Sequence, residues 1–190
     1  TQLGTDDSIL IHAASGGVGT MLIQMAKRRG VKKIIGTVST KEKAAIAYEL
    51  GAHHVLTYEN FSAKVNDYTD GLGVDVVFDS IAGAITEESF RCLAPYGTLV
   101  QFGNSSGQMG QIKTADLHSS CRNVKGFSLG TTRALKPKLL QQVAPEIFSL
   151  LQNESFQVPI AAEFALEDME KAHTFMESRQ HQGKILIKIV

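Results

Sequence analysis

Short apolar runs alternate with amphipathic segments along the first two thirds of the chain. The runs are rich in Ile, Val and Phe, which is typical of buried strands, whereas the segments between them repeat apolar residues at helical spacing. The predicted strands are 8–14, 33–38, 55–58, 74–79, 98–102 and 124–129, and the predicted helices are 20–29, 41–50, 61–68 and 86–93. This alternation predicts an α/β fold, a doubly wound parallel six-stranded sheet with helices on both faces.

After residue 135 the alternation changes. The sequence predicts a helix over 137–151, a short extended segment at 158–160, a helix over 166–180 and an edge strand over 184–190. Six strands already complete a sheet of the predicted kind, so the tail is expected to form a second body of structure. We therefore divide the chain into a sheet domain at 1–135 and a C-terminal tail at 136–190.

The first predicted strand runs directly into a glycine cluster, and a helical pattern follows at once. The cluster comprises Ser15, Gly16, Gly17, Val18 and Gly19. The spacing of Ala14, Gly16 and Gly19 is that of the dinucleotide-binding fingerprint, with Ala in the first glycine position. Gly16 would let the backbone approach a pyrophosphate, Gly19 would let the helix pack on the strand, and the free N–H groups of the first helical turn would attract the phosphates. This context favours a Rossmann dinucleotide site over an ordinary glycine turn.

The end of the second strand indicates which dinucleotide is bound. An NAD site usually has an acid about 20 residues past the glycines, where it binds the ribose 2′-hydroxyl. No acid stands at this strand end, and Ser39 and Thr40 lead instead to Lys43. This pattern favours a 2′-phosphate, because each charge-assisted hydrogen bond to it contributes roughly 1.5–3 kcal/mol of binding free energy. The negative charge of Glu42 argues against a 2′-phosphate here, although at a helix start this side chain can point away from its neighbours. The alternative is that the lysines form a solvated helix face. We expect NADPH or NADP as cofactor.

Composition and charge narrow the possible partners. The chain has 190 residues with 19 basic and 19 acidic side chains, so its zero net charge indicates neither a nucleic-acid partner nor a membrane surface. No apolar run reaches the ~18 residues of a membrane span, and no signal peptide is visible. Two cysteines suit a reducing compartment, and we expect a cytoplasmic protein. A start at Thr1 rather than Met is expected of a processed chain or a piece of a longer one.

The titratable residues predict no metal site and no catalytic constellation. Cys92 and Cys121 are far from each other and from any histidine at metal-ligand spacing. The adjacent pair 53–54 lies on an extended segment, so these two histidines point to opposite faces. His12 is interpreted as a packed strand residue, and Asp79 lacks a histidine partner at triad spacing. We expect no metal, and no catalytic residue is assigned.

Several motifs in the same order resemble one family. They are Ile11-His-Ala-Ala-Ser-Gly-Gly-Val-Gly19, Gly36-Thr-Val-Ser39, Val76-Val-Phe-Asp-Ser80, Phe102-Gly-Asn-Ser-Ser-Gly107, and a C-terminal match at 177–183. Together they resemble the zinc-independent quinone oxidoreductases of the medium-chain dehydrogenase/reductase superfamily, from about Ser8 to the C-terminus. Only the combination is specific, because each motif alone is modest.

The resemblance implies which residues contact the cofactor. Val18 and Gly19 would lie under the pyrophosphate, residues 39–43 and Tyr58 around the 2′-phosphate, and Ser80 by the adenosine half. Those implied along the nicotinamide side are Phe102, Gly103, Asn104 and Ser105. Further contacts are implied at Phe127, Ser128, Leu129 and Arg179. Periodicity alone would make Tyr58, Phe102 and Phe127 core or strand-end residues and Arg179 a surface charge, so these four rest mainly on the resemblance.

The resemblance also implies an activity and an assembly. It implies hydride transfer from the nicotinamide C4 atom to a quinone or to the β-carbon of an α,β-unsaturated carbonyl. A GroES-like catalytic domain is expected before Thr1, with the tail at 136–190 returning to it, so this chain alone would be catalytically incomplete. The segment 124–129 resembles the edge strand through which such enzymes form homodimers. The alternatives are an enoyl-thioester reductase and a non-catalytic nucleotide-binding or sensor module.

Overall fold

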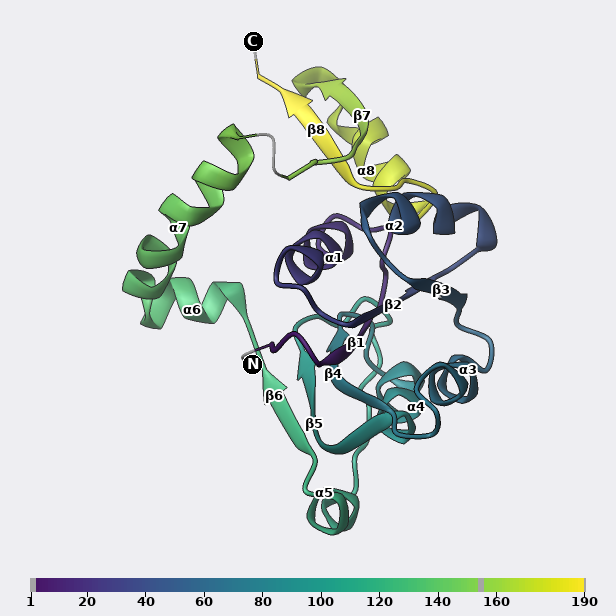
Figure 1. Ribbon diagram of the computed structural model, residues 1–190. Helices are drawn as coiled ribbons and strands as arrows, with labels where there is room; N and C mark the ends of the chain where they lie inside the picture. Colours follow the sequence, from purple (N-terminus) through teal and green to yellow (C-terminus); the bar gives the residue numbers. More distant parts are fainter. Residues whose placement is uncertain (1–2, 154–155, 190) are drawn as a thin grey trace.

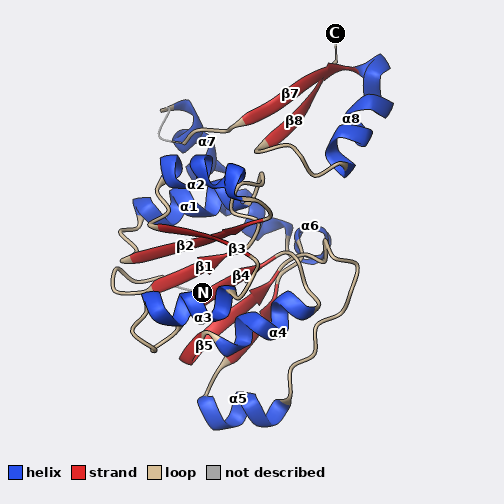
Figure 2. Cartoon of the chain, turned by 90° about the vertical axis from the view of Figure 1, so that its right-hand side faces the viewer, coloured by secondary structure: helices blue, strands red, loops and turns tan. Residues whose placement is uncertain are grey.

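Two parallel sheets organise the chain in the computed structural model, which describes residues 3–153 and 156–189 (Figures 1 and 2). The larger sheet has six parallel strands in the order β3-β2-β1-β4-β5-β6. Its strands are β1 (Ser8–Ile11), β2 (Lys33–Val38), β3 (His54–Thr57), β4 (Val74–Asp79), β5 (Leu93–Gln101) and β6 (Asn123–Gly126). The predicted doubly wound α/β fold is confirmed, and the strand order reverses between β1 and β4.

Helices cover both faces of this sheet. Figure 2 shows α1 (Gly19–Arg28) and α2 (Ala44–Leu50) on one face and α3 (Phe61–Tyr68) and α4 (Ala84–Arg91) on the other. The remaining helices are the 3-10 turn Lys41–Lys43 before α2, α5 (Thr114–Ser120), α6 (Leu129–Leu135), α7 (Pro137–Gln152), and α8 (Met169–Glu177) with its preceding 3-10 turn Leu166–Asp168. No helix in the described part of the chain is both long enough and apolar enough to cross a bilayer.

The central strand β1 divides the core into two layers. Ile9 and Ile11 pack with Ile23 of α1 on one face, and Leu10 packs with Phe61 of α3 on the other; all five side chains are fully buried. Alternation along an extended strand sends neighbouring residues to opposite faces, so a strand buried on both sides must be apolar at every position. This explains the unbroken apolar run in the sequence.

The predicted first and sixth strands end earlier than expected. β1 stops at Ile11 instead of Ala14, because Ala13 adopts a left-handed conformation (φ 50°) that turns the chain out of the sheet. β6 stops at Gly126 instead of Leu129, because Ser128 caps α6 by accepting a hydrogen bond from the Thr131 amide at 3.2 Å. The prediction continued both strands through these turning points.

Further elements differ from the prediction, and β5 begins at Leu93 rather than at residue 98. α5 buries none of its residues, so it has no apolar face for periodicity to detect. α6 has no predicted counterpart, and only its first residue, Leu129, falls within the predicted sixth strand. The predicted extension at 158–160 is instead the approach to β7 (Ile160–Ala165), which pairs in parallel with β8 (Lys184–Lys188).

The tail forms its own small β7-α8-β8 body and docks onto the sheet domain beside α1 and α2 (Figure 2). One docking point is Gln24 of α1, a buried side chain that exchanges two hydrogen bonds with the backbone of Gln157, at 2.9 and 2.8 Å. Another is the glycine turn, where the Gly183 amide donates to the Ser15 carbonyl at 2.9 Å. The tail therefore meets the domain directly at the predicted dinucleotide motif.

Gly19 has no room for a side chain, which gives a direct test of the packing at this turn. A Cβ atom at Gly19 would lie 2.3 Å from the Ala13 carbonyl oxygen, a backbone atom that cannot move aside. We expect Gly19→Ala to lower the free energy of unfolding by about 1–3 kcal/mol, the usual cost of overpacking. Urea denaturation measures this change.

Gly130→Ala is the matched control, because the nearest atom to a Cβ there is the Ser128 hydroxyl at 3.8 Å, in ordinary contact distance. Gly130 lies within α6, so alanine should leave stability unchanged or raise it by up to about 1 kcal/mol. Equal stability losses for the two variants would contradict the close approach of α1 to β1.

Candidate functional site

The site is built around the turn from β1 into α1. The left-handed Ala13 starts the turn, and the Gly16 amide closes it by donating to the Ala13 carbonyl at 2.9 Å. Thr20 then ties the start of the helix to the turn, since its amide and its hydroxyl both donate to the Gly16 carbonyl at 3.0 Å. Gly19 allows α1 to begin directly against the strand. The turn is thus held from both ends.

Two consecutive amides at this turn are available to a ligand. The N–H groups of Val18 and Gly19 donate no hydrogen bond within the described residues, whereas the Gly17 N–H faces the Gly183 carbonyl in a parallel bridge. The first turn of α1 contains no acidic side chain. Such amides carry the positive end of the helix dipole and favour a bound anion. The backbone therefore fits a pyrophosphate, as the sequence predicts.

Beyond β2, the predicted 2′-phosphate residues are open to solvent. Ser39 and Thr40 are exposed, directly after the last residue of the strand. Hydrogen bonding with the Thr40 side chain is the main cause that lowers the pKa of the exposed Glu42.

Residues from three distant segments meet at one side of the turn. The Lys43 ammonium donates to the Arg179 carbonyl, and the Arg179 guanidinium donates to the Ser105 carbonyl at 3.1 Å. All three residues were predicted as cofactor contacts, and the structure brings them together although they are separated by 62 or more positions in the sequence. Two exposed cations here are held only by carbonyl oxygens, which a phosphate would replace as a stronger partner.

Tyr58 is largely buried, and it packs against the start of the glycine turn. Its hydroxyl accepts a hydrogen bond from the Ala13 amide at 2.9 Å, and burial raises the pKa of the phenol. A hydrogen bond with Thr37 acts against that rise. Here the Tyr58 hydroxyl fixes the first residue of the glycine turn.

A buried polar chain continues from Thr37 to His12, which is itself fully buried. The Thr37 hydroxyl and His12 Nδ1 are 2.7 Å apart, and His12 Nε2 lies 2.6 Å from the Ser89 hydroxyl. Ser89 already donates to the Ile85 carbonyl at 2.6 Å, so it accepts from His12, and the imidazole carries its proton on Nε2. His12 is buried, but it lies directly after β1 rather than in the strand as predicted. Its role in linking the turn to α4 has no signal in the sequence.

The carboxyl ends of β4 and β5 form a second cluster of predicted residues. The Ser105 amide donates to the Ser80 carbonyl at 3.0 Å, and a Cβ at Gly103 would lie 2.9 Å from the same carbonyl oxygen. The buried Asp79 holds the segment after β4 by accepting from the Ile81 amide at 2.7 Å and from the neighbouring Ala82 amide. Gly103 is therefore required for the two strand ends to approach.

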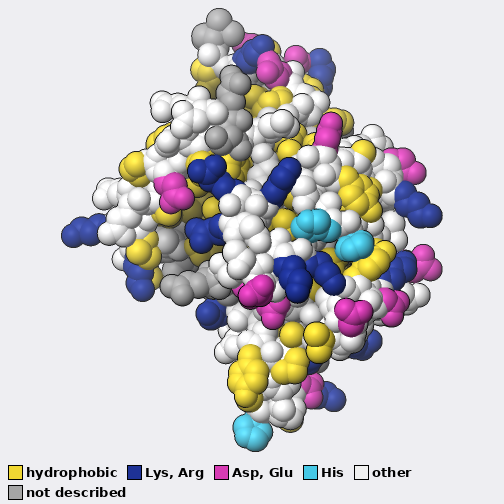
Figure 3. Space-filling model, viewed as in Figure 1, with side chains coloured by type: hydrophobic (Ala, Val, Ile, Leu, Met, Phe, Trp, Pro, Cys, Tyr) yellow, Lys and Arg dark blue, Asp and Glu magenta, His cyan; other side chains and the backbone are white. Residues whose placement is uncertain are grey.

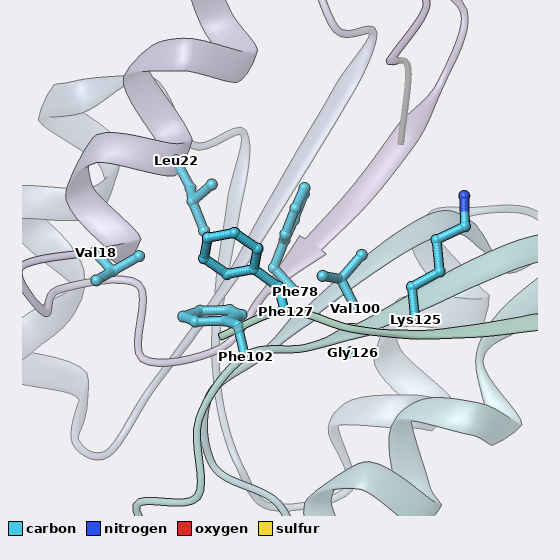
Figure 4. A pocket seen from close by; sticks show the side chains of 8 residues that line it. All are labelled: Val18, Leu22, Phe78, Val100, Phe102, Lys125, Gly126 and Phe127. Atoms are coloured by element: carbon cyan, nitrogen blue, oxygen red, sulfur yellow. The ribbon is translucent and has the colours of Figure 1, made fainter. Parts of the chain in front are cut away.

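An apolar hollow of about 380 Å³ opens beside the turn, between α1 and the ends of β4, β5 and β6 (Figure 4). Its lining residues are Val18, Leu22, Phe78, Val100, Phe102, Lys125, Gly126 and Phe127. Three predicted contacts, Val18, Phe102 and Phe127, thus face one space, although Phe127 was expected in a strand. Figure 3 shows apolar side chains exposed in this part of the surface, with Lys and Arg side chains around them.

Other predicted residues lie apart from this hollow. Gly103 and Asn104 line a hollow with Leu99 and Thr86, against α4 on the opposite face of the sheet. Ser128 borders a third hollow next to α6. Leu129 begins α6 with an exposed side chain. The structure therefore distributes the expected nicotinamide contacts over two faces.

The cysteines and histidines of the described residues form no group of three or more ligands for a metal ion. Cys92 is buried, which raises the pKa of its thiol to about 12 and keeps it neutral. Cys121 is exposed at the end of α5. Sequence reasoning missed one cationic residue beside the turn, Lys184, whose side chain lies next to Gly17.

Known proteins similar to this chain include dehydrogenases and reductases. The profile of a family described as zinc-binding dehydrogenase matches residues 17–145. A quinone oxidoreductase of Pseudomonas aeruginosa is 38% identical, covering 98% of this chain and 58% of the relative, and a 2-haloacrylate reductase of Burkholderia sp. is 34% identical, covering 95% and 55%. The crystal structure of Escherichia coli quinone oxidoreductase complexed with NADPH superimposes with a TM-score of 0.88 at 35% identity, covering 98% of this chain and 59% of that one. The chain spans less than two thirds of these relatives.

The buried His12 makes a prediction about stability and pH. Burial lowers the pKa of His12 to about 4, against a counteracting effect of Asp79, whereas the unfolded chain has a value near 6.5. Below pH 6.5 the unfolded state binds the proton first, so stability is lost as the pH falls from 6.5 to 4. The loss from this residue should total about 3 kcal/mol.

Urea denaturation of His12→Gln and the parent protein across this pH range measures the effect. The variant loses hydrogen bonds and is less stable at pH 7, but its stability should decrease less toward pH 4, so the two curves converge. His118→Gln, which removes an exposed histidine of α5, should follow the parent curve. Parallel curves for His12→Gln and the parent would refute the assigned protonation.

Proposed function

The chain belongs to the zinc-binding dehydrogenase family and, within it, to the quinone oxidoreductases of the medium-chain dehydrogenase/reductase superfamily, and on this premise we propose that it is the NADPH-binding part of an oxidoreductase. The proposed reaction reduces a quinone or an α,β-unsaturated carbonyl compound. The observation that carries the proposal is the pair of unpaired amides at Val18 and Gly19, at the start of α1. These amides suit a pyrophosphate.

The preference for NADPH over NADH is supported by the cations beside the turn. Lys43 and Arg179 lie together, and no acid stands at the end of β2 to bind a ribose 2′-hydroxyl or repel a 2′-phosphate. Among the described residues both cations contact only carbonyl oxygens, so they are free to turn to a phosphate. Ser39 is exposed beside them and offers a hydroxyl donor.

The cofactor supplies the chemistry, which is a hydride from the nicotinamide C4 atom. The chain's own residues bind and orient it. The amides of the turn hold the phosphates, and the apolar hollow with Phe102 and Phe127 excludes water next to the reacting ring. Reduction also consumes a proton, for which we assign no donor among the described residues.

The tail surface supports a larger catalytic unit. Both strands of the small sheet expose apolar side chains; Ile160 and Leu186 are 42% and 40% exposed, and Ile189 beyond β8 is 81% exposed. Such a surface is suited to packing against another body of protein. We propose that it contacts a GroES-like catalytic domain that closes over the nicotinamide and selects the substrate, in a protein of the reducing cytoplasm.

We further propose a homodimer formed through β6. All four residues of this strand are exposed, and it is the last strand on its side of the sheet. The Phe127 amide donates to the Gln101 carbonyl, so by alternation the amides of Asn123 and Lys125 face β5 while those of Val124 and Gly126 face outward. The outward backbone groups of two β6 strands can then hydrogen-bond to each other across a twofold axis.

Binding and turnover with the two nicotinamide cofactors test the proposed function. Fluorescence titration should show tighter binding of NADPH than of NADH. Lys43→Ala should weaken NADPH binding by about tenfold, since it removes one charge-assisted contact to the 2′-phosphate, and change NADH binding by less than about twofold. Oxidation of NADPH should then depend on an added quinone or enone.

Lys64→Ala is the control for the loss of a positive charge, because this lysine of α3 donates to the Glu59 carbonyl away from the turn. It should bind both cofactors like the parent protein. If Lys43→Ala weakened the binding of NADPH and NADH equally, the assignment of Lys43 to the 2′-phosphate would be wrong. Binding without turnover would favour a nucleotide-binding module instead of an enzyme.

A proline at Val124 tests the proposed dimer. The substitution removes one outward amide while leaving the amides that bond β5, so we expect folded monomers in sedimentation analysis. Val124→Thr keeps the amide and the branched shape, and should remain dimeric. A dimer of unchanged affinity in Val124→Pro would show that the subunits do not pair through β6.

A further inference from the structure

The tail brings a fixed pair of residues, Gly183 and Lys184, onto the glycine turn. Gly183 forms a parallel bridge with Gly16, and its amide donates to the Ser15 carbonyl at 2.9 Å. The Lys184 amide donates to the Pro159 carbonyl at 2.8 Å, at the entrance to the small sheet. The backbone on both sides of this pair is therefore anchored, one residue to the sheet domain and the next to the tail.

Gly183 cannot be replaced by a residue with a side chain. Its φ is +85°, and a Cβ there would lie 2.2 Å from the Pro159 carbonyl oxygen. Only glycine permits this close crossing of the two segments. Because the crossing sets the direction of the chain, it also sets the position from which the Lys184 side chain extends.

The Lys184 side chain lies over Gly17. Its Cδ and Cε atoms are 3.2 Å, and its Nζ atom 3.4 Å, from the point that a Cβ at Gly17 would occupy. The ammonium thus lies beside the glycine turn, next to the residue that precedes the unpaired amides of Val18 and Gly19. A cation and the positive end of a helix dipole repel each other, so this placement is unfavourable unless an anion lies between them.

No carboxylate in the described part of the chain neutralises Lys184. The ion pairs found there are Lys171 with Asp168, within the segment that starts α8, and Lys188 with Glu163, across the small sheet. Lys188 lies on the same strand as Lys184 and has a partner, so the strand is not simply a row of solvated lysines. Lys184, next to the turn, is therefore available to an anionic ligand.

We propose that Lys184 binds the pyrophosphate of the dinucleotide, so that the C-terminal tail supplies one of the charges that hold the cofactor. This inference rests on the proposed function, because the anion it assigns is the one that the turn would bind. The amides of the turn contact the phosphates from the side of α1, and Lys184 contacts them from the side of β8. The pyrophosphate then lies between two parts of the protein.

This role differs from that of Lys43 and Arg179. Those cations lie at the Arg179–Ser105 contact and distinguish NADPH from NADH through the 2′-phosphate. The pyrophosphate is common to both cofactors. Removing the Lys184 charge should therefore weaken NADPH and NADH alike, and leave binding of 2′-AMP, which has the 2′-phosphate but no pyrophosphate, unchanged.

The test is to measure the dissociation constants of NADPH, NADH and 2′-AMP for Lys184→Met. We expect about a tenfold loss for each dinucleotide, the effect of one charge-assisted hydrogen bond, and a change below about twofold for 2′-AMP. Lys188→Met is the matched control; it loses a charge from the same strand, together with the Glu163 ion pair, and should bind all three ligands like the parent. Thermal unfolding without ligand checks that each variant is folded, and Lys184→Gln replaces Lys184→Met if that variant is not.

The outcomes separate this inference from the proposed function. Parent-like affinity of Lys184→Met for both dinucleotides, or a loss confined to NADPH, would overturn the assignment to the pyrophosphate. A parent protein that binds neither dinucleotide would overturn the proposed function itself, and the role of Lys184 with it. A matched loss for NADPH and NADH with unchanged 2′-AMP binding is the result that supports it.

Discussion

The close packing of α1 against β1 at Gly19 is the constraint on which the rest of the site depends. A helix that starts this near the strand places its free amides directly beyond the strand's carboxyl end. That end lies where the strand order reverses between β1 and β4, so no crossover covers it and the helices diverge to opposite faces. The free amides, the apolar hollow and the tail contact all lie around this point. A side chain at Gly19 would move the helix away and displace them together.

The turn is also supported from below, by polar groups buried in an otherwise apolar core. Tyr58 holds Ala13, and the chain through Thr37, His12 and Ser89 continues to the backbone of α4. Burying a polar group costs free energy unless it finds a hydrogen-bond partner, and here each donor along the chain of hydrogen bonds faces an acceptor. The direction of these hydrogen bonds requires a neutral imidazole, which ties the shape of the glycine turn to the protonation of a buried core residue. The stability of the core therefore has a pH limit that its apolar composition does not suggest.

The sequence predicted most of the sheet because the relevant forces are local and repetitive. β2, β4 and α3 have the predicted bounds, since continuous burial or a single buried face leaves a clear pattern. α5 has no buried residue, so it leaves no such pattern in the sequence. The glycine turn was recognisable because its spacing is dictated by contacts within one strand and one helix. In contrast, the contact between Gly17 and Lys184 joins positions 167 residues apart and exists only because the tail folds back on Gln24 and Ser15. Local periodicity cannot reveal a contact of that kind.

The tail's contribution has a thermodynamic consequence for the whole site. Arg179, Gly183 and Lys184 belong to the tail, yet they contact the loop after β5 and the turn before α1. In the proposed complex, the free energy with which the tail docks is coupled to the free energy with which the dinucleotide binds, and such coupling acts equally in both directions. A cofactor that bridges Lys184 and the amides of Val18 and Gly19 strengthens the docking of β7 and β8. Any protein surface that covers the exposed side of those strands and holds them in place strengthens cofactor binding by the same factor. The small sheet thus connects the phosphate site to whatever packs on its other side, without requiring the larger sheet to move.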